Sequence, residues 1–184
     1  MWIFGYGSLV WKVDFPHDTK LVGYIKCFNR RFYQHSTDHR GTPEKPGRVV
    51  TLIPGDSSST VWGIAYKIRQ SDVDSVVKHL DYREKGGYKR ITVMFHPKEE
   101  TMKPFEITIY FGNSDNINYA GEADLDTIAE QILHSVGPSG SNVEYILQLA
   151  NAMREIAPDV NDSHLFSIEA KVLSLLDDQE KIKY

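Results

Sequence analysis

The sequence has little of what marks secreted, metal-clustered or membrane-spanning chains. Cys27 is the only cysteine among 184 residues, so neither an intrachain disulfide nor a cysteine zinc cluster can form. No apolar run approaches the roughly 18 residues that a transmembrane helix needs. Residues 1–5 also lack the basic part and the long apolar part of a signal peptide. These absences predict a cytosolic protein with no membrane partner.

An excess of basic charge is also missing. The chain has 21 Lys and Arg residues against 25 Asp and Glu, which gives a formal net charge of −4. Because a protein that grips nucleic acid usually presents a basic face, we expect no nucleic-acid partner. Hydrophobic residues make up 41% of the chain, which is enough to fill one core. We therefore expect a single domain spanning residues 1–184.

Segments rich in β-formers dominate the first two thirds of the chain. Each is bounded by turn residues or alternates apolar and polar positions, as strands do. The predicted strands are residues 2–4, 21–28, 49–53, 60–68, 91–95 and 105–111. Residues 49–53 and 60–68 are separated by a proline, a glycine and several serines, and we expect them to pair as an antiparallel hairpin.

Apolar residues at helical spacing occur in four places, mostly near the end of the chain. Helical apolar stripes run over residues 73–80, 125–133 and 143–153, with stop signals at Gly86-Gly87, Gly137-Pro138 and Pro158, and a last helix is predicted over about residues 163–176. Ser141 and Glu144 have the spacing of a capping box in front of the third helix. Strands in series followed by clustered helices favour an α+β fold over alternating βαβ units. We expect a small mixed or antiparallel β-barrel flanked by helices.

The turn at Gly5, Tyr6, Gly7 and Ser8 directly follows the first predicted strand. Two glycines one residue apart allow positive φ angles, and the backbone N–H groups of such a turn can bind a carboxylate or a phosphate. The segment is not a dinucleotide fingerprint, because Val10 replaces the third glycine and Pro16 interrupts the following helix. It also lacks the G-x-S-x-G of a nucleophile elbow. On the pattern alone, a purely structural turn is the more common case.

Glu84 lies at the predicted end of a short helix, just before Gly86 and Gly87. A carboxylate is unfavourable there because the helix dipole prefers a cation at its C-terminus, and a residue that breaks a local rule is a functional candidate. The neighbouring Arg83 and Lys85 also allow a simpler interpretation, in which Glu84 is a surface acid. Sequence physics alone favours that interpretation.

Other reactive side chains give no further site. The histidines are scattered, and surface or capping roles fit them better than metal ligation, so we predict no metal site. Cys27 falls inside a predicted strand, where an inert buried thiol is expected. Arg30 and Arg31 precede two aromatic residues, but the acidic net charge favours solvated arginines at a strand end over a base-stacking platform.

Several separated motifs, taken together, resemble the ChaC family of glutathione-specific γ-glutamylcyclotransferases. The resemblance runs from residue 1 to about residue 155, and the length is similar to that of the shorter family members. It is carried by residues 2–11 (WIFGYGSLVW), 36–43 (STDHRGTP), 46–52 (PGRVVTL), 83–88 (REKGGY), 137–140 (GPSG), and by Asn142, Glu144 and Tyr145. The resemblance implies a γ-glutamylcyclotransferase-like fold.

The resemblance also implies a reaction and the residues that perform it. Reduced glutathione would be converted to 5-oxoproline and cysteinylglycine without a metal or other cofactor, with Glu84 in the catalytic position of the family. The substrate-binding residues would be Ile3, Phe4, Gly5, Tyr6, Gly7 and Ser8. Weaker candidates for orienting the substrate are Arg40, Arg48 and Tyr145. We expect Glu84 to lie in a partly closed pocket and the protein to act as a monomer.

Two alternatives remain open. A γ-glutamyl amino acid or γ-glutamylamine could replace glutathione as the substrate. The related group with that preference is associated with the segment Tyr-Gly-Ser-Asn. Residues 6–9 here read Tyr-Gly-Ser-Leu, which favours glutathione. A non-enzymatic binding module is the other alternative, and such a protein would be expected to have lost the carboxylate at position 84.

Overall fold

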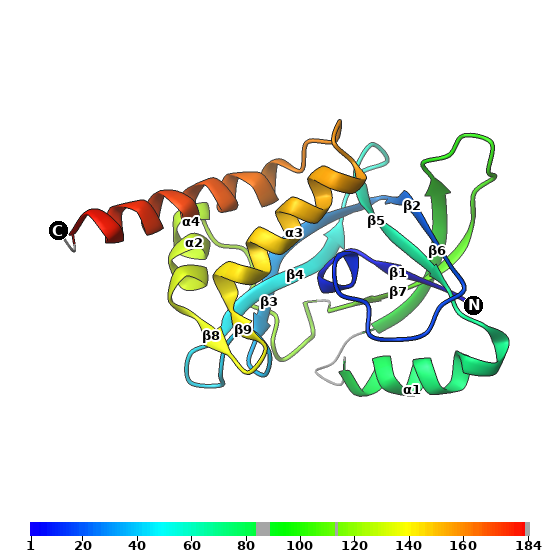
Figure 1. The fold of residues 1–184 in the computed structure, drawn as a ribbon, viewed down its shortest axis with the longest axis horizontal. Coiled ribbons are helices and arrows are strands. Elements are labelled where there is room, and N and C mark those ends of the chain that lie inside the picture. The colour runs from blue at the N-terminus through cyan, green and yellow to red at the C-terminus, as the bar shows by residue number, and fades with distance from the viewer. Residues whose placement is uncertain (84–88, 113, 183–184) are drawn as a thin grey trace. The chain divides into compact units, whose positions relative to one another are not determined.

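The computed structural model describes residues 1–83, 89–112 and 114–182, and the chain forms two compact units (Figure 1). The first unit comprises Met1–Arg30 and Leu52–Ile117, and the second comprises Arg31–Thr51 and Asn118–Tyr184. The chain passes between them three times, within strand β3 (Phe28–Ser36), within strand β4 (Gly47–Pro54) and between Ile117 and Asn118. A single domain spanning residues 1–184 stays a prediction.

The first unit is built on a closed barrel of five strands in the order β1-β5-β2-β6-β7. These strands are β1 (Trp2–Gly5), β5 (Thr60–Lys67), β2 (Thr19–Lys26), β6 (Lys89–Pro97) and β7 (Phe105–Phe111). The strands pair antiparallel except β1 and β7, which are parallel where Ile3 lies opposite Thr108. Together with four α-helices, this mixed barrel confirms the predicted α+β class.

Glycines allow the barrel strands to approach one another closely. Gly23 on β2 lies opposite Gly63 on β5. A Cβ atom on Gly63 would stand 2.2 Å from the Gly5 carbonyl oxygen, and one on Gly23 would stand 2.3 Å from the His96 carbonyl oxygen. Because both obstacles are backbone atoms, neither position can accept a side chain without moving a strand. Between the strands, the core of the barrel is filled by fully buried residues such as Phe4, Ile25, Phe95, Ile107 and Ile109.

Short helical segments complete the first unit. A 3₁₀ turn, η1 (Ser8–Val10), directly follows β1, and a second one, η2 (Gln70–Asp72), leads into helix α1 (Val73–Arg83). Val76 and Leu80 are buried on one side of α1, as the apolar spacing predicts. The helix runs past Leu80, the last residue of the apolar stripe, to Arg83.

The second unit contains three helices and a short hairpin. The helices are α2 (Leu125–His134), α3 (Asn142–Ile156) and α4 (Ser163–Ile182), and α4 packs against both of the others (Figure 1). The hairpin consists of β8 (Val136–Gly137) and β9 (Gly140–Ser141). The apolar stripes seen in the sequence are buried, with Ile132, Leu149, Ile168 and Val172 among the least accessible side chains. Helix α4 continues six residues beyond the predicted end at Leu176.

Two predictions about the strands were wrong. Strand β3 was not predicted, and it pairs with β4, whereas the sequence suggested that β4 would pair with β5. Strand β5 lies between β1 and β2 instead, and buries side chains of both alternating sets, including Val61 and Ala65 on one and Ile64 on the other. A strand with both faces covered and neighbours on both edges has no edge left for β4.

Cys27 was also misplaced by the sequence analysis. It follows the last residue of β2 and is exposed, with a positive φ of 64°. Its N–H donates to the Ser59 carbonyl and its carbonyl accepts from the Gly55 N–H, both at 2.9 Å. Cys27 therefore belongs to the connection between β2 and β3 rather than to a strand interior.

Within the described residues, no helix combines the length and the apolar character that a membrane-crossing helix requires.

Candidate active site

The strand directions place the end of β1 and the start of β6 at the same end of the barrel. Strands β1 and β7 run parallel, so their final residues, Gly5 and Phe111, lie at the same end. Strand β6 runs the opposite way and begins there, with Lys89 opposite Phe111 and Arg90 opposite Tyr110. The turn after Gly5 and Lys89, the first residue of β6, therefore lie at one end of the barrel. Glu84, five positions before Lys89, lies outside the described residues, so its predicted pocket stays a prediction.

The predicted substrate-binding segment forms the end of β1 and the turn that follows. Ile3 and Phe4 pair with Tyr66 and Ala65 on β5, and both side chains are buried, so only their backbone is available to a ligand. Gly7 and Ser8 are partly exposed. Ser8 also begins η1, where its carbonyl accepts from the Lys12 N–H at 2.8 Å.

The sequence suggests that the two glycines of this turn serve to allow positive φ angles. The structure shows that neither is needed for that reason. Gly7 has a φ of −119°, and Gly5 is not among the positive-φ glycines of the chain. Gly5 is required by space instead, because a Cβ atom there would stand 2.7 Å from the Cβ atom of Leu9. The turn folds back tightly on itself, and the Tyr66 hydroxyl donates to the Leu9 carbonyl at 2.6 Å to hold it.

Tyr6 is the residue that fastens this turn to the rest of the barrel. Its side chain is 7% exposed, and its hydroxyl donates to the Tyr110 carbonyl oxygen on β7 at 2.7 Å. Its own carbonyl accepts a hydrogen bond from the Nε atom of Arg30 at 2.9 Å. The side chain and the backbone of Tyr6 are thus fixed by different elements, β7 and β3.

Arg30 is a residue that the sequence analysis judged wrongly. It was expected to be solvated, yet it is only 3% exposed, and its Nη2 atom donates to the Trp62 carbonyl on β5 in addition to the bond to Tyr6. The alternation of side chains along a strand indicates that Arg30 is buried. It shares a face of β3 with Phe32, Gln34 and Ser36, which are all buried. Because β3 is not among the strands predicted from the sequence, the alternation could not be used to predict the burial of Arg30.

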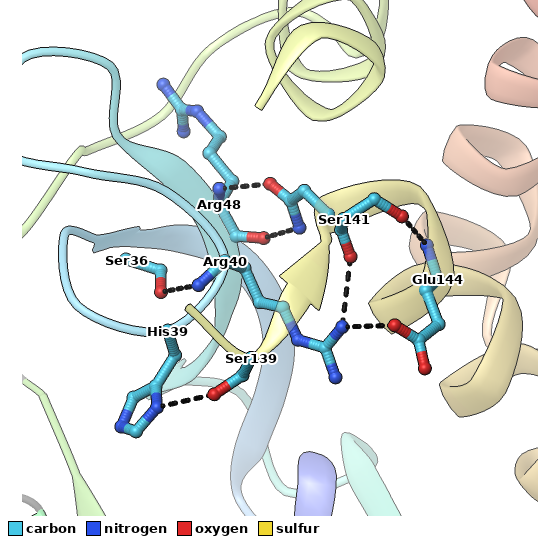
Figure 2. Close-up of polar contacts among 8 residues, drawn as sticks. Ser36, His39, Arg40, Arg48, Ser139, Ser141 and Glu144 are labelled. Carbon is cyan, nitrogen blue, oxygen red and sulfur yellow. Dashed lines mark hydrogen bonds and ion pairs between the residues drawn. The ribbon is translucent and has the colours of Figure 1, made fainter. Parts of the chain in front are cut away.

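A second group of predicted residues meets in the second unit (Figure 2). The Arg40 N–H donates to Ser36 Oγ at 2.9 Å. Its Nη1 atom donates to the Ser141 carbonyl at 3.0 Å and forms an ion pair with Glu144 Oε2 at 2.8 Å. The Arg40 side chain is 8% exposed, so this ion pair is largely shielded at the arginine end. Motif residues 36–43 and 137–145 therefore form one polar cluster.

The predicted capping box is half present. Ser141 Oγ accepts from the Glu144 N–H at 3.1 Å, as an N-cap should. The Glu144 carboxylate pairs with Arg40 rather than returning to the Ser141 N–H. The motif thus starts α3 and also anchors the loop that carries Arg40.

Arg48 and Tyr145 are occupied by hydrogen bonds within the chain. The Nη1 atom of Arg48 donates to the carbonyls of Phe32 and Gly121, at 3.0 and 3.1 Å, and Nε donates to Gln131 Oε1 at 2.7 Å. Burial lowers the pKa of the Arg48 guanidinium. The Tyr145 hydroxyl accepts from the Val50 N–H at 3.4 Å. These contacts give both residues a structural role.

The histidines differ from one another more than the sequence suggested. His39 is at the surface, where its Nδ1 atom lies 3.1 Å from Ser139 Oγ. His164 is partly buried, and its Nε2 atom accepts from the Phe32 N–H at 3.1 Å. Burial, reinforced by the charge of Arg31, lowers the pKa of His164 to about 4. Across the described ranges, no three His, Cys, Asp or Glu side chains are grouped so that they could hold a metal ion.

Comparison with known proteins gives consistent matches along the whole chain. A family model of ChaC-like proteins matches residues 1–175. The protein named glutathione-specific gamma-glutamylcyclotransferase 1 from Danio rerio is 47% identical over 178 residues, covering 96% of this chain and 90% of that protein. The Homo sapiens protein of the same name is 41% identical, with coverages of 96% and 80%.

Solved structures agree with the sequence matches. A crystal structure described as a γ-glutamyl cyclotransferase specific to glutathione from yeast superimposes with a TM-score of 0.88 at 29% identity, covering 95% of this chain and 96% of that one. A second structure, described as a γ-glutamyl cyclotransferase, has a TM-score of 0.57 at 17% identity and shows the shared fold alone.

Proposed function

Because the chain belongs to the ChaC-like family, we propose that it is a glutathione-specific γ-glutamylcyclotransferase. The observation that carries the proposal is the near full-length identity of 41–47% to curated proteins with that name. The proposed products are 5-oxo-L-proline and L-cysteinylglycine. We further propose that the protein acts as a cytosolic monomer, with no cofactor and no nucleic-acid partner.

The reaction is an internal acyl transfer. The α-amine of the γ-glutamyl group attacks its own γ-carbonyl carbon, which forms the new C–N bond of a five-membered lactam. The bond between that carbon and the cysteinyl nitrogen breaks, and a proton passes from the attacking amine to the departing one. No water is consumed and no electrons are exchanged, so the chemistry needs neither an enzyme nucleophile nor a redox cofactor.

Proton transfer is the step that needs a side chain. The α-amine has a reference pKa of about 8 and is mostly protonated at neutral pH. A carboxylate beside it can take the proton and then deliver it to the leaving amine. We assign this role to Glu84, and the support is that β6 begins five positions later, at Lys89, at the barrel end where β1 leads into the turn.

Ile3, Phe4, Gly5, Tyr6, Gly7 and Ser8 are assigned to the γ-glutamyl group. The partial exposure of Gly7 and Ser8 supports this assignment, since N–H groups in such a turn can bind the α-carboxylate and the γ-carbonyl oxygen. The buried side chains of Ile3 and Phe4 keep that backbone in place.

The deciding experiment measures 5-oxoproline release from purified protein, with reduced glutathione and γ-glutamyl-alanine offered separately. We expect turnover of glutathione and little of the dipeptide. Glu84→Gln keeps the size and polarity of the side chain but cannot act as a base, so it should reduce turnover by about 100-fold or more while circular dichroism shows an unchanged fold. Turnover of the dipeptide alone would assign the protein to the related group. No turnover of either substrate would favour the binding module.

The pH profile gives a second test of the base. If Glu84 must be ionised before it accepts the proton, kcat should fall on the acidic side of the profile. Desolvation in a partly closed pocket would raise its pKa and move that limb toward neutral pH. A kcat that stays constant from neutral pH down to the point of unfolding would contradict the assignment.

A further inference from the structure

The buried Arg30 holds the peptide between Tyr6 and Gly7 in a fixed direction. Its Nε atom donates to the Tyr6 carbonyl at 2.9 Å, and its Nη2 atom donates to the Trp62 carbonyl. A guanidinium that is 3% exposed has been removed from water, and removal of such a charge costs free energy unless its hydrogen bonds compensate. The two carbonyls lie at different places in the chain, so Arg30 joins the turn to strand β5.

The direction of the Tyr6–Gly7 peptide follows from its geometry. The chain contains no cis peptide bond in its described part. In a trans peptide the C=O and N–H groups point in opposite directions. Because the Tyr6 carbonyl points at Arg30, the N–H of Gly7 points away from it. Gly7 is partly exposed, and no described residue accepts a hydrogen bond from this N–H.

A positive charge on the carbonyl side also strengthens the N–H as a donor. The guanidinium draws electron density toward the Tyr6 oxygen, so the amide hydrogen of Gly7 becomes more positive, as in a polarised chain of hydrogen bonds. A donor of this kind is worth most where negative charge develops during a reaction. In the proposed reaction that position is the γ-carbonyl oxygen, which becomes an oxyanion when the amine attacks.

We propose that Arg30 is a positioning residue for the reaction, which aims and polarises the Gly7 N–H toward the γ-carbonyl oxygen of the substrate. The inference rests on the proposed function. Arg30 does not touch the substrate in this role and acts through the Tyr6–Gly7 peptide. Its contribution is greater in the transition state than in the bound substrate, so it raises kcat more than it lowers KM.

The test compares Arg30→Met, which has similar length and no charge, with Arg30→Lys, which keeps the charge but cannot direct two fixed N–H groups at two carbonyls. We expect Arg30→Met to lower kcat for glutathione by about 10- to 100-fold with KM changed by less than about 3-fold. Arg30→Lys should recover part of the loss. Full kcat in folded Arg30→Met would overturn the inference and leave the proposed function standing.

Destabilisation needs a matched control, because Arg30 is buried. Arg154→Gln breaks the two hydrogen bonds from Arg154 to the buried Glu169 carboxylate, in the second unit. It should lower the melting temperature while kcat per folded molecule stays within about 2-fold. A similar fall of kcat in Arg154→Gln and Arg30→Met would show that lost stability alone explains both, and would overturn the inference.

A binding measurement separates substrate affinity from catalysis. In the Glu84→Gln background, calorimetry gives the Kd of intact glutathione with and without Arg30→Met. We expect the two Kd values to agree within about 3-fold, since Arg30 acts mainly on the transition state. A loss of affinity as large as the loss of kcat would overturn the assignment.

If both Arg30 variants fail to fold, the direction of the Gly7 N–H can be tested without them. Glycine-labelled Glu84→Gln protein is titrated with glutathione, and the amide resonance of Gly7 is followed. A marked shift at saturation supports the inference, and an unmoved Gly7 resonance overturns it. Absence of 5-oxoproline release by the unsubstituted protein would overturn the proposed function and this inference with it.

Discussion

His164 shows how strongly one buried side chain can tie stability to pH. Its Nε2 atom accepts from the Phe32 N–H, and the pKa of the ring is lowered to about 4 from an ordinary value of 6.5. Burial is the main cause, because a charged ring loses more hydration than a neutral one. In the unfolded chain the ring takes up its proton at a higher pH than in the folded protein.

The first prediction follows from that difference. Between about pH 6.5 and pH 4 the unfolded state binds more protons than the folded state, so the free energy of unfolding should fall as the pH falls through this window. The share due to His164 should be about 2 kcal/mol once partial solvent screening is allowed for. The measurement is urea unfolding at several pH values in the unsubstituted protein.

His164→Gln is the matched control for this effect, since its amide oxygen can still accept from the Phe32 N–H but does not titrate. The variant should lose less stability between pH 7 and pH 4.5 than the unsubstituted protein does. Equal losses in both proteins would mean that other groups cause the pH dependence.

At the residue scale, sequence reasoning succeeded where local patterns decide and failed where distant contacts do. The Gly5–Ser8 segment was singled out because glycine spacing is visible in the sequence. Arg30 was not recognised, because its burial depends on carbonyls of Tyr6 and Trp62 that are far away in the chain. The exposed position of Cys27 likewise depends on its hydrogen bonds to Ser59 and Gly55.

At the element scale, Asn142 joins the start of α3 to β4. It is fully buried, its Oδ1 atom accepts from the Arg48 N–H at 2.6 Å, and its Nδ2 atom donates to the Arg48 carbonyl at 2.8 Å. One side chain thereby satisfies both backbone groups of Arg48. Gly47 precedes Arg48, and any larger residue there would collide with this amide. A Cβ atom added to Gly47 would stand 2.7 Å from Asn142 Oδ1.

The second prediction concerns this link. Asn142→Ala leaves a buried N–H and a buried C=O without a partner, so it should lower the free energy of unfolding by about 2–4 kcal/mol. Asn151→Ala changes the same residue type at an exposed position of α3 and should cost less than about 0.5 kcal/mol. Chemical unfolding of both variants gives the comparison. Similar losses in the two would show that the link contributes nothing specific.

Most elements were predicted from the sequence, because apolar periodicity and turn residues are local signals. The helices were found with their ends displaced by a few residues, and six of the named strands were found. Strand β3 was missed because its residues Arg30, Arg31, Gln34 and His35 are polar, although Arg30 and Gln34 are buried. The pairing of β4 with β3 depends on contacts between strands, which no local pattern contains.

At the scale of the whole molecule, the family motifs divide between the two units. Residues 2–11 and 83–88 belong to the first unit, and residues 36–43 and 137–145 belong to the second. The sequence shows the motifs and their order, but it does not show which motifs lie close together in the folded chain. In the second unit the gathering depends on Arg40, Glu144 and Asn142, whose contacts join residues about a hundred positions apart.

The two ends of the chain should differ sharply in how they tolerate deletion. Strand β1 closes the barrel, because it pairs with β5 on one side and β7 on the other. Removal of residues 2–5 would expose the unpaired edges of both neighbours and open the core that contains Ile3 and Phe4. At the other end, residues 177–182 of α4 are all exposed and contribute little buried apolar surface.

The last prediction compares these two deletions. Deletion of residues 2–5 should give a protein without a cooperative thermal transition, because the buried apolar surface of β1 and its hydrogen bonds are lost together. Deletion of residues 177–184 should keep the transition, with the free energy of unfolding reduced by less than about 1 kcal/mol. Calorimetry and circular dichroism distinguish the outcomes. A cooperative transition after the first deletion would mean that the barrel can close without β1, and its loss after the second would mean that the exposed end of α4 stabilises the fold in a way its burial does not indicate.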